Sequence, residues 1–177
     1  MGLYVAWVHG TALTVESPEK IVPGDQHFGW GTDLVIRSGE ASWFHIPLPV
    51  PASVDDAPVY LNAAMLLFKT EANAELRQVH LYDGSSILQE FNGLRVSGDF
   101  TPHVVPSNTF RLTTSRAVRR GIGLSFFVQG TLGPHPNRLV VVSAAAEYSV
   151  TKPRYSVTQP ILGAVTGLFG RLFSRNP

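Results

Sequence analysis

The chain has 177 residues and no cysteine, so it can bury a core of its own and contains neither disulfides nor thiolate metal sites. Charged residues make up 15% of the sequence and hydrophobic residues 44%, while 16 glycines and 13 prolines indicate short strands joined by many tight turns. The net charge of +1 gives no field for binding a phosphate backbone, and no basic run exceeds Arg119-Arg120. We therefore expect no nucleic-acid partner.

The N-terminal residues predict a strand rather than a signal peptide. They include no basic stretch, and His9-Gly10 interrupts their apolar run. The apolar segment near the C-terminus has about 14 residues, or ~21 Å of helix, against the ~30 Å of a bilayer core. We therefore expect a cytoplasmic protein that could lie on a membrane surface but not cross it.

Alternating apolar residues separated by turn residues predict two hairpins in the first part of the chain. The first joins residues 3–9 to residues 12–16, and the second joins residues 30–37 to residues 41–47. Residues 47–51 contain three prolines, which a central strand could not accommodate. We expect the chain to leave the sheet there.

Two later segments, residues 59–68 and 139–146, are apolar on both faces. This is typical of central strands covered on both sides, or of strands at a subunit contact. In residues 122–128, apolar residues alternate with Gly123, Ser125 and Phe127, as in a half-buried antiparallel strand. About eight or nine strands result, and they predict an all-β fold: a two-sheet antiparallel sandwich of jelly-roll or immunoglobulin-like type, with a closed barrel as the second alternative.

We expect the sandwich to occupy residues 1–150, followed by a polar linker over residues 151–159 and an amphipathic α-helix over residues 160–177. At about 100° per residue, seven large apolar side chains of the helix fall within an arc of roughly 140°. A helix this short is marginal alone in water, so its apolar face needs a partner surface. The expected partner-binding residues are Ile161, Leu162, Val165, Leu168, Phe169, Leu172 and Phe173.

Histidines recur beside aromatic residues, but their spacing places no two imidazoles side by side on one strand, so we expect no metal site. Instead, His27, His45 and His80 are expected to bond backbone carbonyls beneath turns. The sequence has no G-x-S-x-G motif, and Asp55-Asp56, being adjacent, point apart rather than form an acid/base pair. We expect no catalytic residue, no cofactor and no enzyme.

Trp30 and Trp43 flank a predicted turn and are the candidates for a ligand platform, because a flat ring stacks on the apolar face of a sugar or a peptide. Large aromatic residues in short strands are also typical of a core, so both interpretations stay open. Arg119-Arg120 precedes an apolar strand and is either a partner-facing patch or a charged guard against aggregation at a strand edge.

Several short motifs together form a recognisable pattern: WVHG, FGWGT, WFHIPLP, HLYDG and FNGL, at residues 7–10, 28–32, 43–49, 80–84 and 91–94. The combination resembles a group of small uncharacterised bacterial proteins classed as a domain of unknown function, over about residues 5–148. The resemblance implies a bacterial β-sandwich module and no particular activity. It leaves the C-terminal helix outside the pattern.

These observations favour a non-enzymatic interaction or assembly protein that forms a homo-oligomer, or docks on a larger protein complex, through its C-terminal helix. Peripheral membrane binding through the same helix is one alternative, because Arg171 and Arg175 border its apolar arc. A carbohydrate-binding β-sandwich that uses Trp30 and Trp43 is the other.

Overall fold

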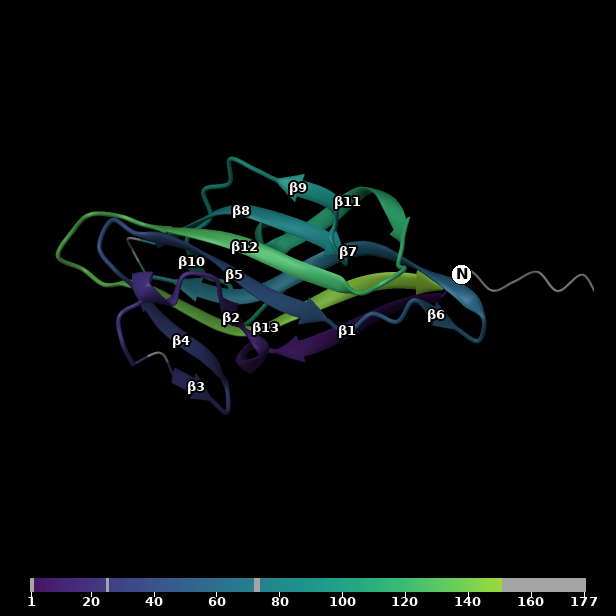
Figure 1. Ribbon diagram of the computed structural model, residues 1–177, viewed down its shortest axis with the longest axis horizontal. Coiled ribbons are helices and arrows are strands. Elements are labelled where there is room, and N and C mark those ends of the chain that lie inside the picture. Colours follow the sequence, from purple (N-terminus) through teal and green to yellow (C-terminus); the bar gives the residue numbers. More distant parts are fainter. Residues whose placement is uncertain (1, 25, 72–73, 151–177) are drawn as a thin grey trace, which may run out of the picture.

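The computed structural model describes residues 2–24, 26–71 and 74–150. This part of the chain contains thirteen β-strands, arranged in one sheet of eight strands and one of five, and all strand pairs are antiparallel. The sheets pack face to face as a two-layer sandwich (Figure 1). The predicted linker and helix, with the seven partner-binding residues, lie outside the described residues.

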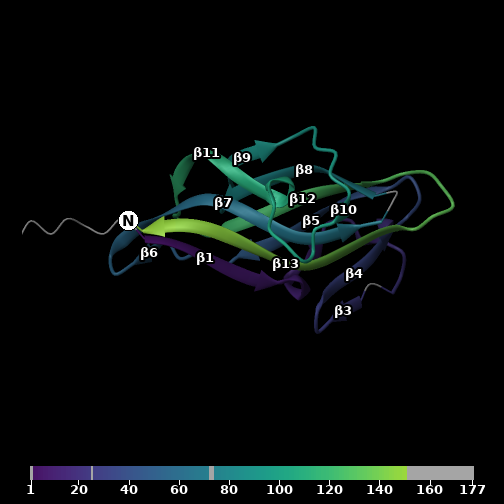
Figure 2. The same cartoon turned by 180° about the vertical axis from the view of Figure 1, so that it is seen from behind.

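The larger sheet, seen from behind in Figure 2, has the order β10-β7-β13-β4-β3, with β1 on β13 and both β11 and β6 on β7. Its strands are β1 (Gly2–His9), β3 (Gln26–Phe28), β4 (Gly31–Ile36), β6 (Ser53–Val54), β7 (Ala57–Thr70), β10 (Gly98–Asp99), β11 (Thr109–Ala117) and β13 (Asn137–Val150). The smaller sheet has the order β2-β5-β12-β8-β9. Its strands are β2 (Thr14–Val15), β5 (Ala41–Leu48), β8 (Ala74–Asp83), β9 (Ser86–Phe91) and β12 (Ile122–Gly130).

The described chain contains no α-helix, and its helical turns are three short 3-10 helices: η1 (Gly10–Ala12), η2 (Pro18–Lys20) and η3 (Pro106–Asn108). No helix within these described ranges is long and apolar enough to cross a membrane.

The core lies between the sheets and is built by alternation along the strands. In the smaller sheet, Phe44 of β5 and Phe126 of β12 point inward as direct cross-strand partners, with ring centroids 5.5 Å apart and planes at 22°. Burying each such side chain stabilises the fold by about 1.5–3 kcal/mol. The residues between them, such as Trp43 and Phe127, must therefore point to the opposite face of the sheet.

The two segments expected to be central strands lie at the centre of the larger sheet, as β7 and β13. They pair with each other from Val59 with Val150 to Thr70 with Leu139, and each has a further strand on its other edge. Their inward side chains join the core, and small residues such as Ala63 and Ala145 are buried on the outward face. Their predicted position as central strands is confirmed.

Both predicted early hairpins are wrong. β1 pairs with β13 in the larger sheet, whereas β2 pairs with β5 in the smaller one, and η1 carries the chain between them. In the same way, β4 belongs to the larger sheet and β5 to the smaller. Two consecutive alternating segments look the same whether they pair with each other or face each other across a core, so the local pattern does not distinguish the two arrangements.

Pro47 also departs from the expectation, because it lies inside β5 rather than after it. It stands opposite Gly123 on β12, while the other neighbour, β2, pairs only with His45 and Phe44. The edge of β5 that faces β2 is therefore unpaired at Pro47. Because proline has no backbone N–H, it is tolerated at such an unpaired position, where no strand requires a hydrogen bond from it.

The WVHG and FGWGT motifs meet on β13. A Cβ atom added to Gly10 would lie 2.0 Å from the carbonyl oxygen of Val141, and one added to Gly31 would lie 2.3 Å from the same oxygen. The hydroxyl of Thr32 donates to the carbonyl of Gly10 at 3.0 Å and joins the two motifs. These glycines let η1 and β4 approach the backbone of β13 where its register shifts, between Val141 and Ser143.

Candidate functional site

Aromatic and polar side chains gather on the outer face of the five-stranded sheet. This sheet lies nearer to the viewer in Figure 1. Register places Trp43 of β5 opposite Phe127 of β12, and Ser125 of β12 opposite His80 of β8. Tyr82 follows two residues further along β8, on the same face. We call Trp43, Phe127, His80 and Tyr82 the aromatic face. Each of the four is half-buried.

The rings of this aromatic face contact one another across three strands. The Trp43 centroid lies 5.2 Å from that of Phe127 and 4.7 Å from that of His80, with planes tilted by 49° and 47°. The rings of His80 and Tyr82 lie 6.3 Å apart. Because β5 and β8 are separated by β12, the indole and the imidazole must meet above β12. On β12, the small residue Ser125 stands opposite His80 on one side and His45 on the other.

Hydrogen-bonding groups flank the rings on both sides. On one side, His45 contacts Ser125 Oγ through Nδ1 at 2.8 Å and Glu16 Oε2 through Nε2 at 3.0 Å. On the other side, His80 Nε2 lies 3.2 Å from Asn92 Oδ1, and the amide of Asn92 donates to Glu90 Oε2 at 3.3 Å. A ring surface edged by carboxylates, an amide and imidazoles provides what a sugar needs: stacking for its C–H face and partners for its hydroxyls.

The three histidines bond side chains, and not backbone carbonyls as the sequence led us to expect. The Nδ1 of His27 lies 2.7 Å from the hydroxyl of Thr32, while His45 and His80 make the side-chain contacts described above. His27 belongs to the larger sheet, whereas His45 and His80 both stand opposite Ser125 on the smaller one. Within the described ranges, no group of three or more His, Cys, Asp or Glu side chains could hold a metal ion.

The two candidate platform residues lie in different places. Trp43 is on the outer face of the smaller sheet, whereas Trp30 is in the turn between β3 and β4 of the larger sheet. Trp30 is 47% exposed, and its ring stacks on that of Phe28, with centroids 4.9 Å apart and planes at 9°. The predicted pair is therefore not one platform, because β4 and β5 do not form a hairpin.

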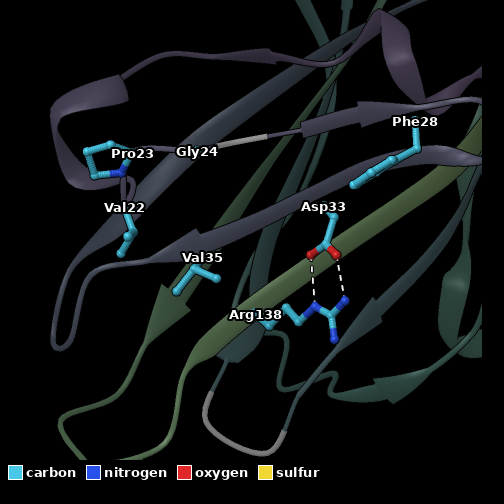
Figure 3. A pocket seen from close by; sticks show the side chains of 7 residues that line it. All are labelled: Val22, Pro23, Gly24, Phe28, Asp33, Val35 and Arg138. Atoms are coloured by element: carbon cyan, nitrogen blue, oxygen red, sulfur yellow. Dashed lines mark hydrogen bonds and ion pairs between the residues drawn. The ribbon is translucent and has the colours of Figure 1, made fainter.

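A hollow of about 220 Å³ lies beside Phe28, with apolar walls that include Val22 and Val35 (Figure 3). At its floor, Arg138 donates from Nε and Nη2 to the two carboxylate oxygens of Asp33, at 2.8 and 2.5 Å. Its Nη1 donates to Glu71 at 3.0 Å. The hydrogen bond to Asp33 raises the pKa of Arg138, against the opposing effect of burial. The guanidinium group of Arg138 is thus hydrogen-bonded to two carboxylates. The hollow therefore has few polar groups left to bind a ligand.

Sequence reasoning identified Trp43 as a site candidate but missed Phe127, Tyr82 and Asn92. One signal was present: the alternation in residues 122–128 places Phe127 on the face opposite the core, together with Ser125. What the sequence lacked was the register between β5, β12 and β8, which brings these side chains together.

These features define a class: a two-sheet antiparallel β-sandwich with an aromatic outer face. The chain belongs to the family of unknown function DUF6623, whose model matches residues 1–131. This confirms the resemblance to an uncharacterised family, although the match ends before β13 and not near residue 148. No curated protein matches the sequence at a significant level.

Solved structures of similar fold include the xylan-binding module CBM86 from Roseburia intestinalis, with 10% identity, coverage of 84% of this chain and 96% of that chain, and a TM-score of 0.48. The xylan-binding module CBM15 has 12% identity and a TM-score of 0.43, and the match covers 82% of this chain and 97% of that chain. TmCBM61, solved with β-1,4-galactotriose, has 16% identity and a TM-score of 0.37, and the match covers 81% of this chain and 86% of that chain. All three TM-scores lie below 0.5, so the likeness carries no inference about the ligand of this chain.

Proposed function

We propose that the protein is a non-catalytic carbohydrate-binding module that holds a glycan on its aromatic face. One observation carries the proposal: Trp43 lies on the outer side of the five-stranded sheet, in contact with Phe127 and His80, and not in the core. An indole held by neighbouring rings loses little side-chain entropy on binding and offers a rigid apolar surface to a sugar.

The polar groups beside the indole favour a carbohydrate over a purely apolar ligand. Glu90 and Asn92 on one side and Glu16 on the other are exposed, and they can accept from or donate to hydroxyl groups. A polymer fits this surface better than a single sugar, because the rings extend along the strands from Trp43 to Tyr82. Along β12 the distance from Phe127 to Gly123, which lies opposite Tyr82, is four residues, or about 13 Å.

Affinity electrophoresis in gels that contain a panel of plant and microbial polysaccharides tests the proposal. We expect at least one polysaccharide to retard the wild-type chain, and Trp43→Ala to abolish the retardation while thermal melting still shows a cooperative transition. Trp7→Ala is the matched control, because Trp7 is exposed on the larger sheet. If Trp43→Ala does not fold, Tyr82→Ala replaces it. If Trp30→Ala abolishes the retardation and Trp43→Ala does not, the assignment of the binding site to the aromatic face is overturned. The absence of retardation by every polysaccharide would overturn it too.

A second candidate function, self-association, has support from β1. This edge strand pairs only with β13 in the described residues, and it has no acidic or basic side chain other than His9. Its outward side chains Leu3, Val5 and Trp7 are 65%, 48% and 45% exposed. An uncharged edge of this kind can pair antiparallel with the same edge of a second copy and close a two-fold dimer without like-charge repulsion. Assembly through residues 160–177 stays a prediction.

Light scattering at several concentrations tests self-association. We expect a dimer that Val5→Lys converts to a monomer, since an edge lysine opposes strand pairing. Val22→Lys is the control, because Val22 is exposed at 40% but lies outside β1. A wild-type chain that is monomeric at every concentration would rule the β1 dimer out.

A further inference from the structure

A second hollow, of about 370 Å³, lies between the turn that joins β8 to β9 and the end of β11. Three arginines line it, Arg116, Arg119 and Arg120, together with the hydroxyl group of Ser86 and the apolar side chain of Leu88. All three arginines fall within five residues of sequence, and all are exposed. The hollow is therefore a local concentration of positive charge on a chain whose net charge is only +1.

The main chain that carries Arg119 and Arg120 is held in place by the buried carboxylate of Asp83. This carboxylate accepts N–H bonds from Arg119 at 2.9 Å, from Arg120 at 2.7 Å and from Gly121 at 3.0 Å. Asp83 is 6% exposed. Three backbone bonds to one charged acceptor fix the turn before β12, so the positions from which both arginines extend are set before any ligand arrives.

The opposite wall is fixed by a contact between the two sheets. The side-chain oxygen of Gln89, on β9, accepts from the backbone N–H of Thr113, on β11, at 2.8 Å. The pairing of β11 with β7 shifts register between Arg111 and Arg116, so β11 takes up extra residues there. We attribute the space between β9 and the end of β11 to this irregularity.

The protein neutralises the positive charge of the hollow only in part. Among the described residues, no carboxylate lies within ion-pair distance of the guanidinium groups of Arg116, Arg119 or Arg120. By contrast, Arg111 pairs with Glu147 and Arg138 with Asp33 and Glu71. Among the described lining residues, the one carboxylate is that of Asp83, which accepts three backbone bonds and attracts Arg120 electrostatically. Three guanidinium groups against one carboxylate leave an excess of positive charge in the hollow.

A role in guarding a strand edge does not explain Arg119 and Arg120. The strand that follows Arg119-Arg120 is β12, which is paired along its length with β5 on one side and β8 on the other. It has no free edge in the described structure that a charge could protect. The positive charge is therefore available for an external anion.

We infer that this hollow binds an oxyanion, the carboxylate or sulfate group of an acidic polysaccharide, and that the ligand of the aromatic face is accordingly acidic. Guanidinium groups match both anions, because each presents paired N–H donors to paired oxygens. The inference rests on the proposed function through position: Tyr82 of the aromatic face directly precedes Asp83, and Arg120 packs over Gly84, where an added Cβ would lie 2.8 Å from Arg120 Cδ.

The anion site is tested first, without any polysaccharide. Sodium sulfate and sodium glucuronate are titrated to millimolar concentrations into the isotopically labelled full chain, and the amide and guanidinium Nε signals are followed by NMR. We expect saturable shifts at Arg119, Arg120 and Gly121 that Arg116→Gln and Arg119→Gln weaken. Arg95→Gln is the control, since Arg95 is exposed, has no carboxylate partner in the described structure and does not line the hollow. The absence of saturable shifts at Arg119, Arg120 and Gly121 would overturn the anion site.

The source of the anion is tested by affinity electrophoresis with acidic polysaccharides and their neutral counterparts, such as polygalacturonate and its methyl ester. We expect Arg116→Gln to weaken retention by the acidic polymer roughly tenfold, and added salt to weaken it too, while retention by the neutral polymer is unchanged. Trp43→Ala should weaken retention by both polymers.

Other outcomes would contradict parts of the proposal. If only neutral polymers retain the protein, and Arg116→Gln does not change that retention, the aromatic face is supported but the acidic ligand is overturned. If sulfate causes saturable NMR shifts but no polysaccharide retains the protein, the proposed function is overturned, and a polysaccharide as the source of the anion with it. The anion site itself would still stand. Arg116-dependent binding to anionic vesicles or RNA instead of polysaccharide overturns the source.

Discussion

The rings of Trp43 and His80 lie 4.7 Å apart although their strands are not neighbours in the sheet. Between these strands runs β12, whose residue opposite His80 is Ser125, with a small side chain. We expect a larger side chain at that position to crowd the two rings, since it would stand on the same face of the sheet beside His80. The contact between the rings is therefore expected to depend on the small size of residue 125.

Replacing Ser125 tests this dependence. We expect Ser125→Leu to displace the indole, to change the near-ultraviolet circular dichroism and to weaken glycan retention at least fivefold, which corresponds to about 1 kcal/mol. Ser125→Ala is the matched control. It removes the hydroxyl that contacts His45, at 2.8 Å, but adds no bulk, so the indole should keep its place and retention should change little. Equal losses in both variants would show that the hydroxyl, and not the space, is what matters.

Within the FGWGT motif, one glycine contacts β13 and the other does not, which predicts a sharp contrast between them. In FGWGT, Gly31 has a φ of +149°, and a Cβ there would lie 2.3 Å from the carbonyl oxygen of Val141, whereas nothing lies within 4 Å of a Cβ at Gly29. We expect Gly31→Ala to lower the free energy of unfolding by at least about 2 kcal/mol, because backbone strain and overpacking add. Gly29→Ala should change it by less than about 0.5 kcal/mol. Urea unfolding of both variants measures the difference, and similar values would contradict the close approach seen on β13.

The parts of the fold that the sequence predicts are those that depend on a strand's own pattern. Residues 59–68 and 139–146 are apolar on both faces, which is sufficient to place them centrally. The second early hairpin is wrong because β4 pairs with β13 and β5 with β12, whose residues follow between 74 and 109 positions later. Pairing over such separations leaves no local mark in one sequence. For the same reason Trp43 was recognisable as a candidate, while its neighbours from β8 and β12 were not.

Asp83 predicts a pH dependence of stability. Burial, the largest single effect, favours the neutral acid, but the three N–H bonds from Gly121, Arg120 and Arg119 together hold the pKa of this carboxyl below its usual value. A carboxyl with a lowered pKa in the folded state stabilises the protein above its unfolded pKa of about 3.9, and this stabilisation is lost as the pH falls through the folded value.

The corresponding variant is Asp83→Asn. At pH 7 it should be less stable than the wild type by about 1.5–3 kcal/mol, since one charged acceptor of three bonds is replaced by a neutral one. The difference should shrink below about pH 4, as Asp83 becomes protonated in the wild type. Asp56→Asn is the control, because the Asp56 carboxylate accepts no hydrogen bond in the described structure and lies in an exposed turn. Urea unfolding between pH 3 and pH 7 measures both, and a gap that stays constant over that range would contradict the role of the ionised carboxylate.

The ion-pair cluster beside Phe28 gives the last prediction. Arg138 bridges Asp33 and Glu71, and the side chain of Asp33 is only 16% exposed. Arg138→Met would leave Asp33 without its partner, so we expect a loss of about 1–2 kcal/mol, less than for a fully buried pair because the arginine itself is 39% exposed. Replacing Asp33 as well, with Val, which suits a strand, should recover most of this loss, because no unpaired carboxylate then remains at that position. Thermal and urea unfolding of the two single variants and the double variant form a thermodynamic cycle. A double variant no more stable than Arg138→Met would mean that the arginine contributes through its packing against the walls of the hollow rather than through its charge.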